Sequence, residues 1–79
     1  MNTALIEKMV DEFVGNRIKG FCDVEGFFNY YNVDYKANNF KYDEKSGIVS
    51  ITYKLLDDIS VIIKVDEISG IVLQLEFLL

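Results

Sequence analysis

Histidine, proline and tryptophan are absent from this 79-residue sequence, and cysteine occurs only once, as Cys22. A single thiol cannot form a disulfide within the chain, and without histidine there is no Cys and His cluster to hold a structural zinc ion. A chain this short then depends on a dense apolar core or on a partner subunit for its stability. Apolar residues make up 51% of the chain, which is enough for either.

Long apolar runs are also missing. No uninterrupted run approaches the ~18 residues of a membrane-spanning helix, which predicts no membrane partner. Residues 1–7 lack the basic stretch and apolar core of a signal peptide. Together with the single free thiol, these absences predict a cytoplasmic protein.

Basic residues are few. The chain has 8 Lys and Arg against 13 Asp and Glu, for a net charge of −5. The charge sums to 0 over residues 1–20, to −1 over 21–42 and to −4 over 43–79. Because no segment is locally basic, the sequence predicts no direct binding of nucleic acid.

Three apolar runs dominate the second half of the sequence, at residues 48–56, 59–65 and 71–79. They are rich in Ile, Val, Leu, Tyr and Phe and are bounded by acidic turn residues, which predicts consecutive antiparallel strands. A short edge strand is expected before them, over residues 40–43. The loop Leu56-Asp57-Asp58 is expected to pair Leu55 with Ile59.

The first half of the sequence has helical spacing. An amphipathic helix is predicted over residues 3–19, with its end at 14 or at 19 because Gly15 weakens the last turn. Its sheet-facing side chains are predicted to be Leu5, Ile6, Met9, Val10 and Phe13. A second helix is favoured over residues 24–32, although its aromatic residues also suit a strand, and 33–39 are expected to form a loop. The fold class is therefore α+β: a single domain over 1–79, with one or two N-terminal helices packed on a four-stranded antiparallel β-meander.

A turn motif occurs twice in the sequence, as Asp43-Glu44-Lys45-Ser46-Gly47-Ile48-Val49 and as Asp66-Glu67-Ile68-Ser69-Gly70-Ile71-Val72. Each copy predicts a hairpin loop that ends in a glycine with positive φ. Alternate turns of a meander lie at the same end of the sheet, so both copies and their carboxylates are expected at one end.

The strands after these two turns have opposite apolar parity. After the first turn the apolar alternation begins two residues past the glycine, at Val49, whereas after the second turn it begins one residue past the glycine, at Ile71. This difference matters because a one-residue change of register moves every side chain to the other face of the sheet. Three explanations stay open: loops that differ by one residue, a bulge, or a sheet covered on both faces. The last would leave an outer apolar face of Ile48, Leu56, Ile62, Val72 and Leu78.

Few side chains suit catalysis. Cys22 has no neighbouring cation to activate its thiol, so it is expected to be a small buried hydrophobe. Neither acidic turn has the spacing of a calcium loop, and no metal or cofactor is predicted. Turn formation and solubility explain the carboxylate pairs; the functional interpretation is a negative patch for a basic partner.

Seven of the eleven aromatic residues lie between positions 27 and 42. Phe27, Phe28 and Phe40 are expected in the core, and exposed tyrosines are expected to contact a partner. The predicted partner-binding residues are Tyr30, Tyr31, Tyr35, Asp43, Glu44, Asp66 and Glu67.

The sequence thus predicts a small acidic, non-enzymatic interaction protein, an inhibitor or adaptor that binds a larger protein with a basic surface. A phage or mobile-element inhibitor of a host nucleic-acid enzyme is one protein of this type. The alternative is a small carboxylate-based hydrolase or metal-dependent enzyme. A homodimer is also predicted, through Ile62, Val72 and Leu78, because the last strand carries only one charge, Glu76, to protect its edge.

Overall fold

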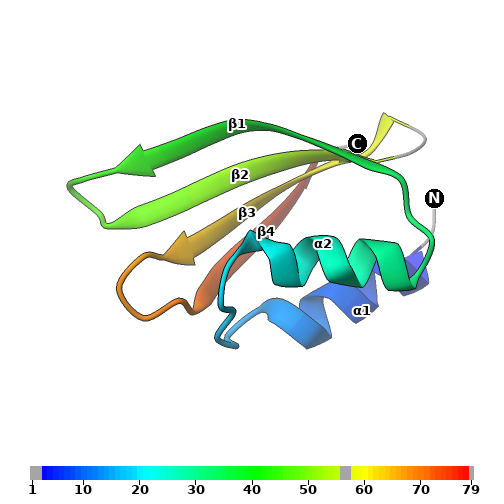
Figure 1. Cartoon of the computed structure of the whole chain (residues 1–79), viewed down its shortest axis with the longest axis horizontal. Coiled ribbons are helices and arrows are strands. Elements are labelled where there is room, and N and C mark those ends of the chain that lie inside the picture. The colour runs from blue at the N-terminus through cyan, green and yellow to red at the C-terminus, as the bar shows by residue number, and fades with distance from the viewer. Residues whose placement is uncertain (1–2, 56–57, 79) are drawn as a thin grey trace.

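The computed structural model describes residues 3–55 and 58–78, in which two helices cover one face of a four-stranded sheet (Figure 1). The helices are α1 (Thr3–Phe13) and α2 (Phe21–Tyr30), and they run antiparallel to each other. The strands are β1 (Tyr35–Asp43), β2 (Ile48–Leu55), β3 (Ser60–Asp66) and β4 (Val72–Leu78). They pair antiparallel in the order β1-β2-β3-β4, so the predicted α+β meander is confirmed.

The two helices differ from their predicted bounds at the ends. α1 stops at Phe13, beside the earlier of its two predicted ends, because Gly15 takes a φ of 81°. Met9 and Phe13 are buried as predicted, whereas Val10 is 40% exposed and does not face the strands. α2 begins at Phe21, before its predicted start at residue 24.

Strand β1 is longer than predicted. Residues 35–39 belong to it and are not a loop: Tyr35 pairs with Leu55, and Asn38 pairs with Thr52. The register then shifts between Asn38 and Lys41, where Asn39 has a φ of 52°. The asparagines that suggest a turn therefore form a bulge within an edge strand, since asparagine tolerates the left-handed conformation.

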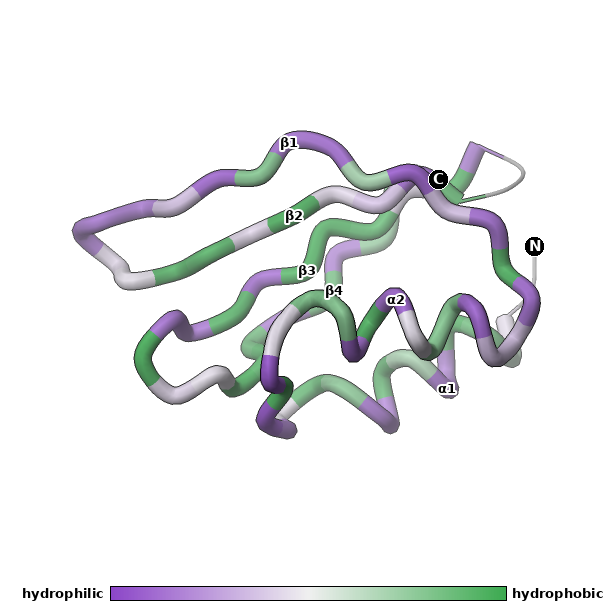
Figure 2. Tube along the Cα trace, viewed as in Figure 1, coloured by the Kyte–Doolittle hydropathy of each residue, from purple (hydrophilic) through white to green (hydrophobic). Residues whose placement is uncertain are grey.

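The core lies between the helices and the inner face of the sheet. Its largest fully buried side chains are Tyr53, Phe28, Met9, Ile63, Val24, Val61 and Val72. Figure 2 shows apolar residues along β2 and β3, whereas β1 is largely hydrophilic. The Leu55 N–H donates to the Ile59 carbonyl at 2.7 Å, which confirms that predicted pairing. Leu56 and Asp57, in the same predicted loop, lie outside the described residues, as does Leu79 at the end of the last predicted strand.

A bulge in β4 resolves the parity conflict. Gln74 pairs with Lys64, and Val72 pairs with Val65, so Leu73 is an additional residue between them. Val72 is fully buried in the core, and its predicted place on the outer face is wrong. The linker between the helices holds it there: the Gly15 N–H donates to the Val72 carbonyl at 2.8 Å, and the Val72 N–H donates to Asn16 O at 2.9 Å. The same two bonds cover the β4 edge at Val72.

Candidate functional site

The predicted partner-binding residues lie in two separate places. The two acidic turns are at one end of the molecule, where the chain passes from β1 to β2 and from β3 to β4 (Figure 1). Tyr30 and Tyr31 are at the opposite end, where α2 finishes. Because the molecule is 34 Å long, these residues do not form one surface.

The two turns share one geometry. Gly47 and Gly70 have φ values of 71° and 74°, and each donates its N–H to the aspartate carbonyl that opens its turn, at 2.8 Å in both copies. The prediction of a closing glycine with positive φ is confirmed. In addition, the Glu67 N–H donates to the Gly47 carbonyl at 3.0 Å, so the turns touch at one end of the sheet, as predicted.

The aspartates of these turns serve the turns themselves. Asp43 Oδ1 accepts the Lys45 N–H at 3.1 Å, and Asp66 Oδ2 accepts the Ser69 N–H at 3.0 Å. Hydrogen bonds from the Ser69 side chain and then from its backbone hold the pKa of Asp66 below its usual value. Glu44 and Glu67 are exposed. Within residues 3–55 and 58–78, no group of three or more Cys, Asp and Glu side chains is placed to hold a metal ion.

Three further predicted placements are wrong. Cys22 is exposed, because α2 starts early and buries Val24 and Phe28 on its other side. Phe40 is 64% exposed; it lies on the bulged edge strand and meets Phe21 edge-on, with 6.2 Å between the ring centres. Tyr35, which is predicted to be an exposed tyrosine, is half-buried and packs against Phe28 with 5.4 Å between the ring centres, and its contact with a partner stays a prediction.

The two helices form a groove on their outer side, which we call the interhelical groove. Its volume is about 400 Å³, and it is lined by Glu12, Asp23, Gly26, Phe27, Tyr30 and Tyr31. Two carboxylates and three aromatic side chains therefore line the same groove. Tyr30 is 79% exposed and Tyr31 is 38% exposed, so both rings are available to a ligand.

Ring contacts hold the aromatic wall of this groove in place. Tyr31 packs between two rings, with 4.7 Å to the Phe27 centre and 4.9 Å to the Tyr30 centre. The Lys8 Nζ atom lies 5.1 Å from the centre of the Tyr31 ring, within the range of a cation–π contact. The chain's own ammonium group thus shows that a Tyr31 ring face can hold a cation.

Gly26 lies in the interior of α2 on the floor of the interhelical groove. A glycine there costs roughly 1 kcal/mol of helix stability relative to alanine. A Cβ at Gly26 would meet no atom within 4 Å, so core packing does not require glycine. Its structural effect is to leave the groove open. The spacing of Asp23, Phe27 and Tyr30 on one helical face is the sequence signal that could have revealed this groove.

Comparison of the chain with protein-family models, with curated proteins and with solved structures finds no match in any of the three. In the part of the chain that the structure describes, neither α1 nor α2 has the length and apolar character needed to cross a membrane.

Proposed function

We propose that the chain is a non-enzymatic interaction protein that binds a larger protein by taking a cationic side chain of that partner into the interhelical groove. The observation that carries the proposal is the composition of the groove, whose lining combines the carboxylates of Glu12 and Asp23 with aromatic side chains. Aromatic faces attract cations, and carboxylates accept charge-assisted hydrogen bonds from them.

Arginine fits this groove better than lysine. A guanidinium is planar, stacks on aromatic rings and is more weakly hydrated than an ammonium, so it loses less when it leaves water. Its ring-stacking and its N–H groups match the two kinds of side chain that line this groove, the aromatic rings and the carboxylates. Asp23 keeps an oxygen for this purpose, because only Oδ2 accepts the Lys19 N–H, at 2.8 Å.

In this proposal the protein is a cytoplasmic inhibitor or adaptor, and its partner has a basic surface. A second contact with that surface, through Glu44 and Glu67, stays a prediction, because both side chains are exposed in the two acidic turns. The carboxylate-based enzyme is not carried forward, because Asp43 and Asp66 both accept hydrogen bonds within their own turns.

Selection of peptides from a displayed random library on the purified protein tests the proposal. We expect enrichment of arginine-containing peptides, and we expect citrulline in place of the arginine to abolish binding. In the Gly26→Leu variant, a leucine side chain fills the groove from its open floor. Binding of the selected peptides should then fall at least tenfold, which is about 1.4 kcal/mol.

The matched control is Asn29→Leu, which adds the same side chain to an exposed position of α2 outside the groove. Its affinity should equal that of the parent. Selected peptides without arginine or lysine, or equal binding by the Gly26→Leu variant, would show that the groove is not the binding site.

A further inference from the structure

The face of the sheet opposite the helices gathers basic residues that are dispersed in the sequence. The strand register places Lys41, Ser50 and Lys64 side by side across β1, β2 and β3, and it places Lys36 opposite Lys54. Their neighbours along β2, such as Tyr53, are buried on the helical side, so these residues point to the other face. We call the surface formed by Lys36, Lys41, Ser50, Thr52, Lys54 and Lys64 the lysine face.

This surface overturns the premise that the chain has no local basic patch. Four of the eight basic residues of an acidic protein lie on it. They come from three strands and are separated by acidic turns in the sequence, so a count by segment does not reveal them. Among residues 3–55 and 58–78, no carboxylate forms an ion pair with any of the four lysines.

Two lysines of this face also repel each other. Lys36 and Lys54 are direct cross-strand partners, and like charges in that position destabilise a sheet. Lysines on the edge strand β1 discourage pairing with another sheet, which accounts for Lys36 and Lys41. It does not account for Lys54 and Lys64, because β2 and β3 are internal strands. An anion held between the lysines would relieve the repulsion.

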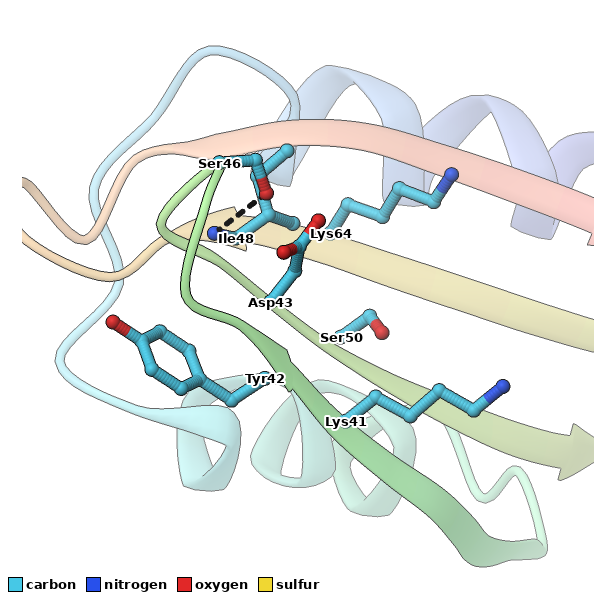
Figure 3. Close-up of a pocket in the computed structure, with 7 residues that line it drawn as sticks. All are labelled: Lys41, Tyr42, Asp43, Ser46, Ile48, Ser50 and Lys64. Atoms are coloured by element: carbon cyan, nitrogen blue, oxygen red, sulfur yellow. Dashed lines mark hydrogen bonds between the residues drawn. The ribbon is translucent and has the colours of Figure 1, made fainter.

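The surface is hollowed at its centre. Two adjoining hollows of about 570 Å³ and 370 Å³ share Lys41, Ser50 and Lys64 in their linings. One carboxylate also lines each hollow, Asp43 in the first and Glu76 in the second, so the lysines of this face outnumber the carboxylates of the hollows. Figure 3 shows both lysine side chains extending in the same direction on either side of Ser50, with the Tyr42 ring turned away from them. The two ammonium groups and the hydroxyl can therefore donate to neighbouring anionic groups of one chain.

We infer that the lysine face binds the phosphate backbone of duplex nucleic acid. All four cations are lysines, which bind phosphate as point charges, whereas carboxylate recognition favours the two-pronged geometry of arginine. The four lysines span roughly 10 Å across the strands and 13 Å along them, which exceeds a single phosphate. A backbone with regularly spaced phosphates fits that span.

The duplex is favoured over a single strand because of what the surface offers to bases. Proteins that bind single strands stack the exposed bases on aromatic rings. The register places no aromatic side chain of the described strands in the two lysine rows. Binding through phosphates alone increases with charge density, so a duplex should bind more tightly than a single strand, and without sequence preference.

Fluorescence anisotropy with a labelled mixed-sequence duplex of 20 base pairs, across a salt series, tests the inference. With up to four phosphate contacts, the slope of log K against log salt should be about −3 to −4. The Lys41→Gln, Lys64→Gln double variant should reduce the magnitude of the slope by about 2 and weaken binding at low salt at least tenfold. Melting curves confirm that each variant is folded.

The matched control is the Lys8→Gln, Lys19→Gln double variant, which removes the same charge from the helical side of the molecule. Its salt slope should equal that of the parent. The inference is overturned if this control weakens binding as much, if the parent does not bind at low salt, or if a single strand binds more tightly than the duplex. Equal competition by a polyglutamate chain of matched charge would show that phosphate is not what the surface recognises.

Discussion

The hydroxyl of Tyr53 on β2 donates a hydrogen bond of 2.9 Å to the carboxylate of Glu25 on α2. Tyr53 is fully buried, and its ring packs edge-on against Phe28 with 5.3 Å between the centres. A buried hydroxyl without a partner would destabilise the fold, and here the partner is a half-buried carboxylate at the boundary of the core. This bond therefore joins the helical layer to the centre of the sheet.

Replacing Tyr53 by Phe should lower the free energy of unfolding by about 1–3 kcal/mol, since a hydrogen bond to a charged group is lost. Urea unfolding followed by circular dichroism measures the change. The control is Tyr30→Phe, because Tyr30 is 79% exposed and its stability should stay within about 0.5 kcal/mol of the parent. Equal midpoints for the parent and the Tyr53 variant would contradict the assignment.

The same bond predicts a loss of stability at alkaline pH. Burial, and then the bond to Glu25, raise the pKa of Tyr53 well above its usual value. In the unfolded chain the phenol ionises near pH 10, whereas in the folded chain it keeps its proton to higher pH. The stabilisation is thus complete below about pH 10 and is lost as the pH rises toward the folded pKa. The stability difference between parent and Tyr53→Phe, measured at pH 9 and pH 11, should shrink at pH 11; a constant difference would refute this.

The sequence predicts β2, β3 and β4 well because each is an apolar run between turn residues, and it predicts the α1 stripe through Met9 and Phe13. It predicts only the end of β1, because that edge strand is largely polar and contains a bulge. It leaves the register of β4 undecided, because the residue before the Leu73 bulge, Val72, accepts the Gly15 N–H and donates its own N–H to Asn16 O, and both partners are distant in the sequence. A local pattern does not contain that contact.

The candidate sites were less predictable for the same reason. The lysine face exists only once the register of three strands is known, and the interhelical groove needs Glu12 of α1 beside α2. The predicted exposure of Tyr30 and Tyr31 is correct. The predicted exposure of Tyr35 is not, because the packing of α2 on the sheet brings Phe28 against its ring, and the sequence does not show that contact.

The two turn glycines provide a test of the contact between the helix linker and the sheet. Both have positive φ, so alanine at either should cost about 1–2 kcal/mol. At Gly47 a Cβ meets no atom within 4 Å, whereas at Gly70 it would lie 2.9 Å from the Ile18 carbonyl oxygen. Gly70→Ala should therefore destabilise the protein by about 1–3 kcal/mol more than Gly47→Ala in urea unfolding. Equal effects would show that the linker does not pack against this turn.

Self-association stays a prediction, and of the three residues predicted for it only Ile62 and Leu78 remain available. Val72 is in the core, but Leu73 and Leu78 are 48% and 46% exposed, and Ile62 is half-buried on the outer face. Beyond Val72, β4 carries a single charge, Glu76, where edge strands usually carry lysine or proline. Two copies that pair antiparallel through β4 would extend the sheet and cover this edge by two-fold symmetry.

Sedimentation velocity of the parent at micromolar concentrations should therefore give a dimer. The Ile62→Lys, Leu78→Lys variant should give a folded monomer, because two added charges oppose each other across a two-fold interface. The Tyr30→Lys, Ile68→Lys variant adds the same charge at positions that are 79% and 88% exposed and lie outside β4, and it should stay dimeric. A parent that is monomeric at these concentrations rules out the dimer. If both variants dissociate instead, net charge and not the β4 surface controls assembly.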